Sequence, residues 1–288
     1  MKVRNRLIQA ELAMRIDAGI TLAPEEEANR RLMALKHEEI ERTREYFPPA
    51  HSFLKSKTRQ LIDQSPILEI MRRMPKGGVL HAHGCVAMGD RYWLIKNATY
   101  LPNCYIYQGE EEPPRKGTLR ICEEPPEGEW FLISDLRKAA DDVEEFDEKL
   151  YQSVTLGEED LELPDIWAEF RKCFARSFGM FRNEEIRYGF CQKMLRDLIE
   201  ENVQYIEARG GLGSQKIIEE IQRDHPEFKV KYIYSATRSL SQEKMAESLD
   251  KAIDERVAEP DIVIGFDLME EEDKTHTDLY FIHELLEA

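Results

Sequence analysis

The chain has 288 residues, 42% of them hydrophobic, which is enough apolar material for one large domain or two modest ones. Its 57 acidic side chains outnumber the 40 basic ones and give a formal net charge of -17. This excess repels phosphate backbones and anionic membranes, so nucleic acid is not expected as a partner. No run approaches the roughly 20 apolar residues of a membrane-spanning helix, and the polar residues 1–11 lack a signal-peptide core. Neither membrane insertion nor a signal peptide is expected in this chain.

The first predicted elements are two helices with no strand between them. Residues 23–46 have Pro24 at an early position, an acidic first turn and apolar residues at helical spacing. Residues 51–73 follow a pair of prolines and continue the helical pattern. We therefore predict an N-terminal helical domain over residues 1–73, which is either an appendage or an arm for oligomerisation.

Four short apolar runs in residues 74–288 predict buried strands. They cover residues 76–83, 203–208, 230–235 and 262–268. Helical patterns lie between them, over residues 165–180, 186–201, 214–224 and 241–258. This alternation predicts an α/β fold with a parallel sheet, either doubly wound or closed as a barrel. In both architectures the site lies at the carboxyl ends of the strands.

Residues 97–151 are predicted to form an insertion after the first strand, because they are rich in proline, glycine and charge apart from a predicted helix over residues 134–148. Cys104 and Cys122 bracket part of it, and either a disulfide or two unconnected thiols fits that spacing. No two of the five cysteines form a CxxC pair, which argues against a structural zinc cluster. Asn97 begins a glycosylation triplet, which has meaning only in a secreted protein.

Two histidines close the first predicted strand. Because side chains at positions i and i+2 of a strand project to the same face, His81 and His83 can reach one ion. Such a pair suits Zn²⁺, which in catalytic sites takes three protein ligands and leaves one position open. A His-x-His pair alone is more often ordinary polar residues at a strand end. Its position after a glycine pair, at the carboxyl end of a strand, favours a metal site. Asp267, at the end of the fourth strand, is expected to orient a metal ligand by a hydrogen bond or to cap a helix, rather than to bind the metal directly.

The segment from Met74 to His83 resembles the first-strand motif of the adenosine deaminases, in the form found in their growth-factor-related secreted branch. The resemblance continues through residues 97–100, 130–146, 167–174, 225–228, 233–235 and 265–268. It implies the first half of a (β/α)8 barrel of the metal-dependent hydrolase type, preceded by a helical dimerisation arm. It also implies zinc-dependent hydrolysis of adenosine, or a related nucleoside, to inosine and ammonia.

The resemblance assigns roles to residues of this chain. His81 and His83 would be zinc ligands, Cys104 and Cys122 would form a disulfide, and the insertion would bind a cell-surface receptor. The complete protein would be a secreted homodimer. One helix would wall the nucleoside pocket with Trp167, Ala168, Glu169, Phe170, Arg171, Lys172, Cys173 and Phe174. The family's remaining zinc ligands and its catalytic residues come from later strands, so they are expected beyond Ala288 and no catalytic residue is expected in this chain.

Three substrate-contacting positions differ from the family pattern. Gly84 replaces an aspartate, Thr237 a histidine and Glu270 a glycine. A buried nucleoside group left without its partner costs about 1 to 3 kcal/mol, so the three together could abolish useful affinity. Two alternatives therefore stay open: a non-catalytic extracellular ligand of growth-factor type, and an amidohydrolase adapted to another substrate.

Overall fold

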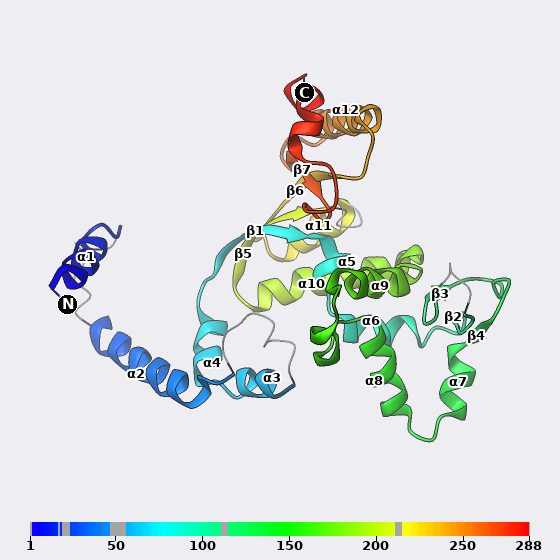
Figure 1. Cartoon of the computed structure of the whole chain (residues 1–288), viewed down its shortest axis with the longest axis horizontal. Helices are drawn as coiled ribbons and strands as arrows, with labels where there is room; N and C mark the ends of the chain where they lie inside the picture. The colour runs from blue at the N-terminus through cyan, green and yellow to red at the C-terminus, as the bar shows by residue number, and fades with distance from the viewer. Residues whose placement is uncertain are drawn as a thin grey trace. The chain divides into compact units, whose positions relative to one another are not determined.

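The computed structural model describes residues 2–16, 18, 24–46, 56–110, 115–210 and 215–287. The chain divides into two compact units, Met1–Met71 and Arg72–Ala288 (Figure 1). The predicted helix starts at residues 23, 51 and 214 lie outside the described residues. In the described part of the chain, no helix combines the length and the apolar character needed to cross a membrane.

The first unit is helical. Its helices are α1 (Lys2–Ala13), α2 (Glu25–Thr43), α3 (Ser56–Asp63) and α4 (Pro66–Arg73), which continues to the start of the second unit. The helix predicted over residues 51–73 is two helices, because the hydroxyl of Ser65 accepts the N–H groups of Ile67 and Leu68 and starts a new helix. The same hydroxyl donates to Glu39 of α2 over 2.8 Å, which ties α2 to α4.

A four-stranded parallel sheet forms the centre of the second unit. Its strands are β1 (Gly77–His83), β5 (Val203–Arg209), β6 (Lys229–Thr237) and β7 (Val263–Met269). All four predicted strands are confirmed. Their spatial order, β1-β5-β6-β7, follows the chain without reversal, and every neighbouring pair is parallel. A doubly wound sheet reverses its strand order, whereas a (β/α) barrel does not, so the topology matches the first half of a barrel.

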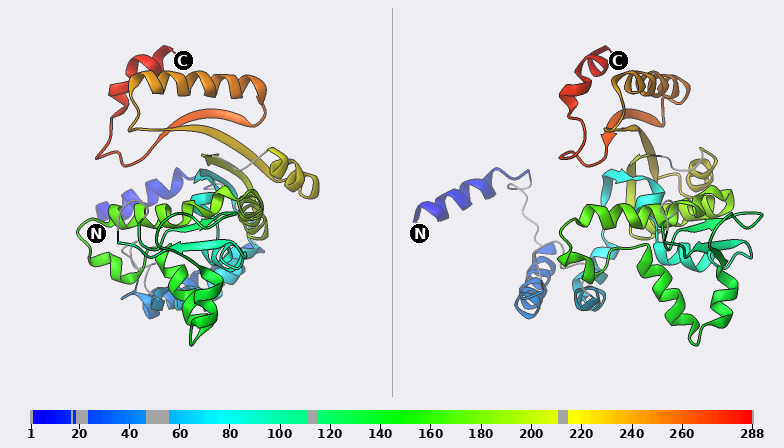
Figure 2. Two further views of the ribbon diagram at one scale, coloured as in Figure 1. Left: turned by 90° about the vertical axis from the view of Figure 1, so that its right-hand side faces the viewer. Right: turned by 45° about the vertical axis from the view of Figure 1, so that its right-hand side comes forward.

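Helices cover the sheet along its length. The helices that flank or connect the sheet strands are α9 (Ile166–Phe178), α10 (Glu184–Glu200), α11 (Gln215–Asp224), α12 (Gln242–Ala258) and α13 (Ile282–Glu287). Short 3₁₀ turns are η2 (Glu158–Glu162), η3 (Met180–Arg182) and η4 (Asp278–Phe281). Figure 2 shows α12 lying along β6 and β7, where Met245 and Leu249 pack against Ala236. Burial of each such large side chain contributes roughly 1.5–3 kcal/mol to folding.

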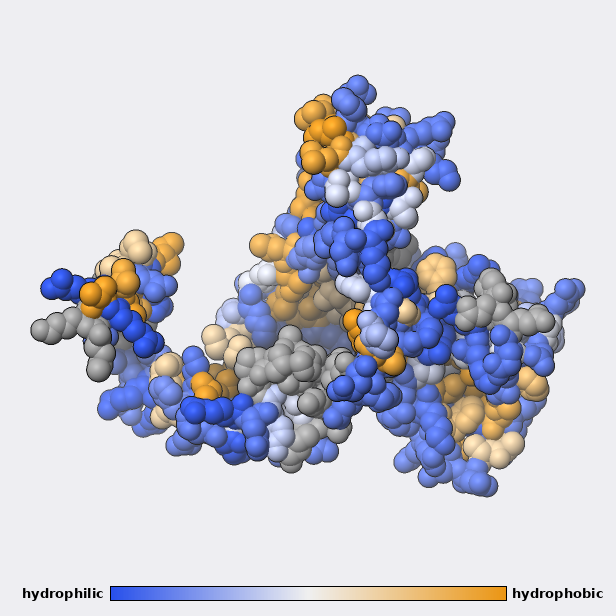
Figure 3. All heavy atoms as spheres, in the orientation of Figure 1, coloured by the Kyte–Doolittle hydropathy of each residue, from blue (hydrophilic) through white to orange (hydrophobic). Residues whose placement is uncertain are grey.

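The two edges of the sheet expose apolar side chains. Leu80 on β1 is 60% exposed and Ile264 on β7 is 39% exposed. Figure 3 shows apolar atoms at the surface over this region of the second unit. The residues that the structure describes therefore leave part of the sheet's apolar surface uncovered.

The predicted insertion contains a second, antiparallel sheet that the sequence did not indicate. Its strands, in the order β3-β2-β4, are β2 (Cys104–Tyr107), β3 (Leu119–Ile121) and β4 (Trp130–Leu132). The single helix predicted over residues 134–148 is wrong in extent, because the segment forms α7 (Ile133–Ala139) and α8 (Val143–Ser153). Asp142 separates them, since its carboxylate accepts the N–H groups of Glu144 and Glu145 and begins α8.

One buried carboxylate joins the insertion to the helix before it. α5 (Gly84–Met88) and α6 (Arg91–Ala98) follow β1. Asp147 on α8, with a side chain only 1% exposed, accepts Arg137 of α7 at 2.9 Å, Lys96 of α6 at 2.7 Å and the Tyr100 hydroxyl at 2.6 Å. Burial alone would raise the pKa of Asp147, but the hydrogen bonds from Lys96, Tyr100 and Arg137 outweigh it and hold the pKa below its usual value.

Candidate functional site

The two predicted metal-binding histidines meet at the carboxyl end of β1. The Nε2 atoms of His81 and His83 lie 3.2 Å apart, and both side chains are exposed. Two ring nitrogens this close, on open side chains, fit a shared cation. Across the described residues, no group of three or more His, Cys, Asp or Glu side chains converges in a way that could hold a metal. The pair could therefore supply two nitrogen ligands, and an ion there would need its other ligands from further groups.

β1 is irregular where it carries His81. Val79 pairs with Ile206 and Ala82 with Ala208, so β1 has one more residue than β5 between these two pairings. Such a bulge bends a strand and re-aims its side chains, and bulges are common next to active sites. Arg209 of β5 donates to the Leu80 carbonyl over 3.0 Å and so supports the irregular stretch.

Arg209 and Asp267 form an ion pair at the same edge of the sheet. The Nε of Arg209 donates to Asp267, whose other carboxylate oxygen accepts the Leu268 N–H over 2.8 Å. Burial by itself raises the pKa of Asp267, but the bonds from Arg209 and Leu268 outweigh it and hold the pKa below its usual value. Burial lowers the pKa of His83, and the nearby His81 and Arg209 lower it further. Asp267 is thus engaged by Arg209, and its predicted orienting role stays a prediction.

The predicted pocket-wall helix, α9, carries a row of aromatic rings. Trp167 meets Phe170 edge-on at 5.6 Å, and Phe170 meets Phe174 edge-on at 4.9 Å between ring centroids. Trp167 and Phe170 are 42% and 39% exposed, so part of each side chain is open to solvent. The other predicted residues are placed differently. Glu169 pairs with Lys172, Arg171 with Glu271, Ala168 is half-buried, and Cys173 is buried.

Ion pairs attach α9 to the segment that follows β7. Arg171 pairs with Glu271, and Lys274 reaches Asp165 at 3.3 Å and Glu271 at 3.2 Å. Because Glu271 is the second residue after the end of β7, these contacts bring α9 to the carboxyl edge of the sheet. The structure thus places α9 beside the same edge that carries the histidine pair.

The three positions that depart from the family pattern lie at strand ends. Gly84 begins α5 directly after His83 and is buried. Thr237 ends β6, and its hydroxyl accepts that of Ser239 over 3.4 Å. Glu270 follows β7 with a φ of 99°, a left-handed conformation that favours glycine, and its carboxylate accepts the Ser239 N–H over 2.9 Å. Glu270 therefore has a glycine-type backbone conformation and adds a carboxylate after the end of β7.

The backbone at Glu270 predicts an unusual order of stability. Glu270→Gly should be about 1 kcal/mol more stable than Glu270→Ala, because both variants lose the Ser239 contact and only glycine removes the backbone strain. At neighbouring Glu272, which has no positive φ, the alanine variant should be the more stable one. Chemical denaturation of the four variants measures both differences. If the alanine variant is the more stable one at both positions, the backbone of Glu270 is not strained.

The cysteine pairing differs from the one expected from the family resemblance. The structure joins Cys85 of α5 to Cys191 of α10 and leaves Cys104, Cys122 and Cys173 as free thiols. On the β2–β3 ladder Cys104 lies opposite Ile121, and the Cys122 N–H bonds to the Asn103 carbonyl. A regular pleat then directs the Cys104 and Cys122 side chains to opposite faces, which explains why the expected bond is not formed.

Peptide mapping distinguishes the two pairings. Digestion without reductant should yield one disulfide-linked peptide pair that contains Cys85 and Cys191. Thiol titration of the unfolded, unreduced chain should find three free thiols, those of Cys104, Cys122 and Cys173. A linked peptide with Cys104 and Cys122 would instead restore the family pairing.

The remaining sequence prediction at the surface concerns Asn97. Its side chain is exposed at the end of α6, and its amide donates to the Trp93 carbonyl over 2.7 Å. A surface cavity of about 400 Å³ lies near it, lined by Tyr92, Lys96, Glu144, Glu145, Asp147 and Glu148. That cavity contains none of the predicted site residues.

Sequence comparison relates the chain to the adenosine deaminases. Residues 1–71 match the family described as Adenosine/AMP deaminase N-terminal. The chain is 32% identical to adenosine deaminase 2 of Sus scrofa over 98% of its own length, and 31% identical to adenosine deaminase 2 of Homo sapiens over 100%. The chain is thus similar to adenosine deaminases over nearly its whole length. It spans 61% and 60% of the length of these two relatives.

Solved structures of deaminases are also similar to the chain. One is the Arabidopsis ADAL complexed with IMP, with a TM-score of 0.44 and 16% identity over 76% of this chain and 56% of that one. Another is an adenine deaminase from Arthrobacter aurescens, with a TM-score of 0.43 and 16% identity over 75% of this chain and 54% of that one.

Proposed function

We propose that this chain provides the first two metal ligands and one wall of the nucleoside pocket of a zinc-dependent enzyme that hydrolyses adenosine to inosine and ammonia. The observation that carries the proposal is the convergence of His81 and His83, with Nε2 atoms 3.2 Å apart, at the carboxyl end of a barrel-type strand. Active sites lie at this end of (β/α) barrels. The similarity to adenosine deaminase 2 over nearly the whole chain gives the reaction class.

The donor set fits zinc. Imidazole nitrogens are common zinc ligands, and the exposed pair is open toward further ligands. Bound there, zinc would supply Lewis-acid activation of a water molecule. The Arg209–Asp267 pair would fix the polar edge around the histidines, and Trp167 and Phe170 would stack on a purine base and exclude water.

The proposed setting is extracellular, as part of a secreted homodimer. A disulfide between Cys85 and Cys191 suits an oxidising compartment, and the exposed Asn97 is open to glycosylation. In this proposal residues 1–73 form the dimerisation arm and residues 97–151 the receptor-binding insertion. The antiparallel sheet and the Asp147 contacts give that insertion a fixed shape.

The alternative is a non-catalytic, growth-factor-like extracellular ligand. Its specific support is the state of the three altered positions. Gly84 offers no side chain, and both Thr237 and Glu270 bond to Ser239 of their own chain instead of facing a ligand freely. A nucleoside would find fewer partners there than the family pattern supplies.

Zinc content and product formation separate the two functions. The complete protein that contains this chain is purified, its zinc is measured per chain, and inosine formation from adenosine is followed. Zinc near one per chain together with turnover supports the deaminase. A folded protein that makes no inosine at any zinc content supports the non-catalytic ligand.

A further inference from the structure

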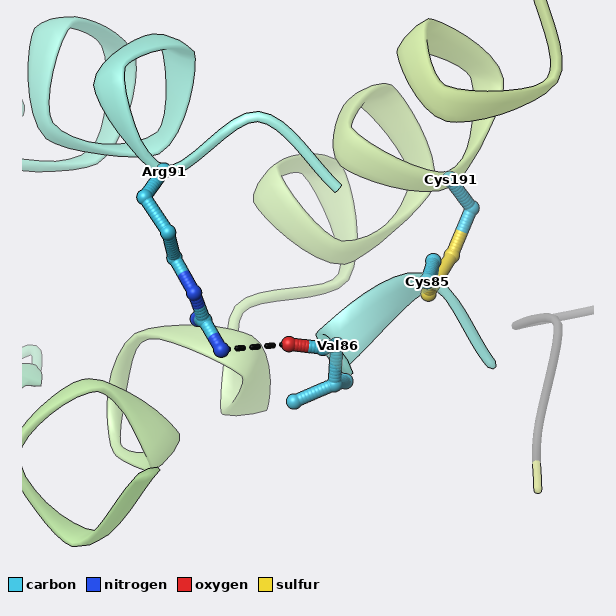
Figure 4. The surroundings of a disulfide bond; sticks show 4 residues. All are labelled: Cys85, Val86, Arg91 and Cys191. Carbon is cyan, nitrogen blue, oxygen red and sulfur yellow. Dashed lines mark hydrogen bonds between the residues drawn. A yellow bond between two sulfur atoms is a disulfide. The ribbon is translucent and has the colours of Figure 1, made fainter. Parts of the chain in front are cut away.

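The segment that follows the histidine pair, α5, is held by two contacts. α5 starts directly after His83, and its second residue, Cys85, is bonded to Cys191 on α10 (Figure 4). Cys85 is 1% exposed and Cys191 is fully buried, so the bond lies inside the core. The two cysteines are 106 residues apart in sequence, so the bond fixes the end of β1 to a distant helix.

A half-buried arginine holds the next residue, Val86. The guanidinium of Arg91 donates to the Val86 carbonyl, and also to the Ser177 hydroxyl of α9 over 3.2 Å. Phe174 and Phe181 place their rings against the same guanidinium. Gly89 ends the segment where a side chain cannot fit, because a Cβ there would lie 2.3 Å from the ring of Phe190. α5 is thus held by α10 at Cys85 and by Arg91 at Val86.

β1, which carries the pair, is held less regularly. β1 is an edge of the described sheet, its ladder is irregular between Val79 and Ala82, and both histidines are exposed. Where the ladder is irregular, contacts outside it keep the spacing of the ligand pair, and the Arg209 bond to the Leu80 carbonyl is one such contact. The nearest covalent anchor is two residues after His83.

We infer that the Cys85–Cys191 disulfide is a positioning element for the His81–His83 pair. It fixes the position of the carboxyl end of β1, so that the two imidazoles converge on one metal ion. This role rests on the proposed metal site. Removal of groups that orient metal ligands without binding the metal typically weakens metal affinity by about ten- to a hundredfold.

The test measures two-imidazole coordination directly, without turnover. The probe is Cu²⁺–iminodiacetate, because copper binds nitrogen sites more tightly than the other divalent first-row metals and the chelate leaves positions open for imidazoles. Its dissociation constant and the number of coordinated imidazoles, from electron paramagnetic resonance, are compared for the native chain and for Cys85→Ser/Cys191→Ser. Cys104→Ser/Cys122→Ser is the matched control, and His81→Ala is the one-imidazole reference.

The native chain and the matched control should bind the probe through two imidazoles. The Cys85→Ser/Cys191→Ser variant should bind at least about tenfold more weakly and give the one-imidazole signal of His81→Ala, while circular dichroism shows it folded. If serine prevents folding, Cys85→Val/Cys191→Ala keeps the site apolar and is measured in its place. A folded variant with native affinity and two imidazoles overturns the positioning role alone. A native chain that binds no better than His81→Ala overturns the metal site and the positioning role together.

Discussion

Replacement of Asp147 by alanine should lower the free energy of unfolding by about 3–5 kcal/mol, the cost of leaving a buried charge without its partner. The side chains of Asp147 and Arg137 are only 1% and 10% exposed, so water cannot replace the lost carboxylate. Arg137 would keep its bonds to the carbonyl and hydroxyl of Thr99, but its charge would be uncompensated. Denaturant unfolding monitored by circular dichroism measures the loss.

The same network predicts how stability depends on pH. The pKa of Asp147 in the folded chain lies below its ordinary value of 3.8. Its contribution is therefore fully present above that value and is lost as pH falls through the folded pKa. The difference in free energy of unfolding between the native chain and Asp147→Ala should be constant between about pH 5 and 7. It should become smaller below about pH 4, as the Asp147 carboxylate takes up a proton.

Asp135 on α7 provides the matched control. It pairs with Lys138 over 3.0 Å, but the two side chains are 66% and 76% exposed. Asp135→Ala should therefore cost less than about 1 kcal/mol, as exposed ion pairs do. Similar losses for the two variants would mean that the Asp147 carboxylate is not buried among cations.

Replacement of His81 or His83 by alanine in the complete protein should reduce zinc content from near one per chain to near zero. Inosine formation should fall at least about a thousandfold, because the metal supplies several kcal/mol of transition-state stabilisation. Zinc analysis after dialysis and an assay of inosine release measure the two effects. This prediction rests on the convergence of the two Nε2 atoms.

His225→Ala is the control for the histidine variants. His225 precedes β6, at the amino end of the sheet, and lies beside Glu227. Its removal should leave zinc content and turnover close to native. Retention of zinc by both His81→Ala and His83→Ala would place the metal elsewhere in the complete protein.

The sheet could be predicted from the sequence because its signals are local. Each strand is a short apolar run, and the helical patterns between the runs imply parallel pairing. The antiparallel sheet was missed because β3 and β4 have only three residues each and pair across long connections, as in Cys104 with Ile121 and Tyr107 with Trp130. Such short strands carry no alternation that a sequence pattern could reveal.

The candidate site was predictable to a similar extent. His81 and His83 are two residues apart on one strand, so their meeting follows from strand geometry alone. The bond between Cys85 and Cys191 could not be foreseen, because it depends on how α10 packs against α5. The left-handed backbone at Glu270 had only an indirect signal, the glycine of the family pattern at this position, since glutamate itself does not favour that conformation.

The attachment of α9 to the segment after β7 has a consequence for solution conditions. It consists of Arg171, Lys274, Asp165 and Glu271, and three of these four side chains are 42% to 52% exposed. Added salt shortens the Debye length from about 10 Å at 0.1 M to about 3 Å at 1 M and weakens such pairs. High ionic strength should therefore loosen the attachment of α9 while the hydrogen-bonded sheet stays intact, so that binding at the proposed nucleoside pocket should be more sensitive to salt than the fold itself.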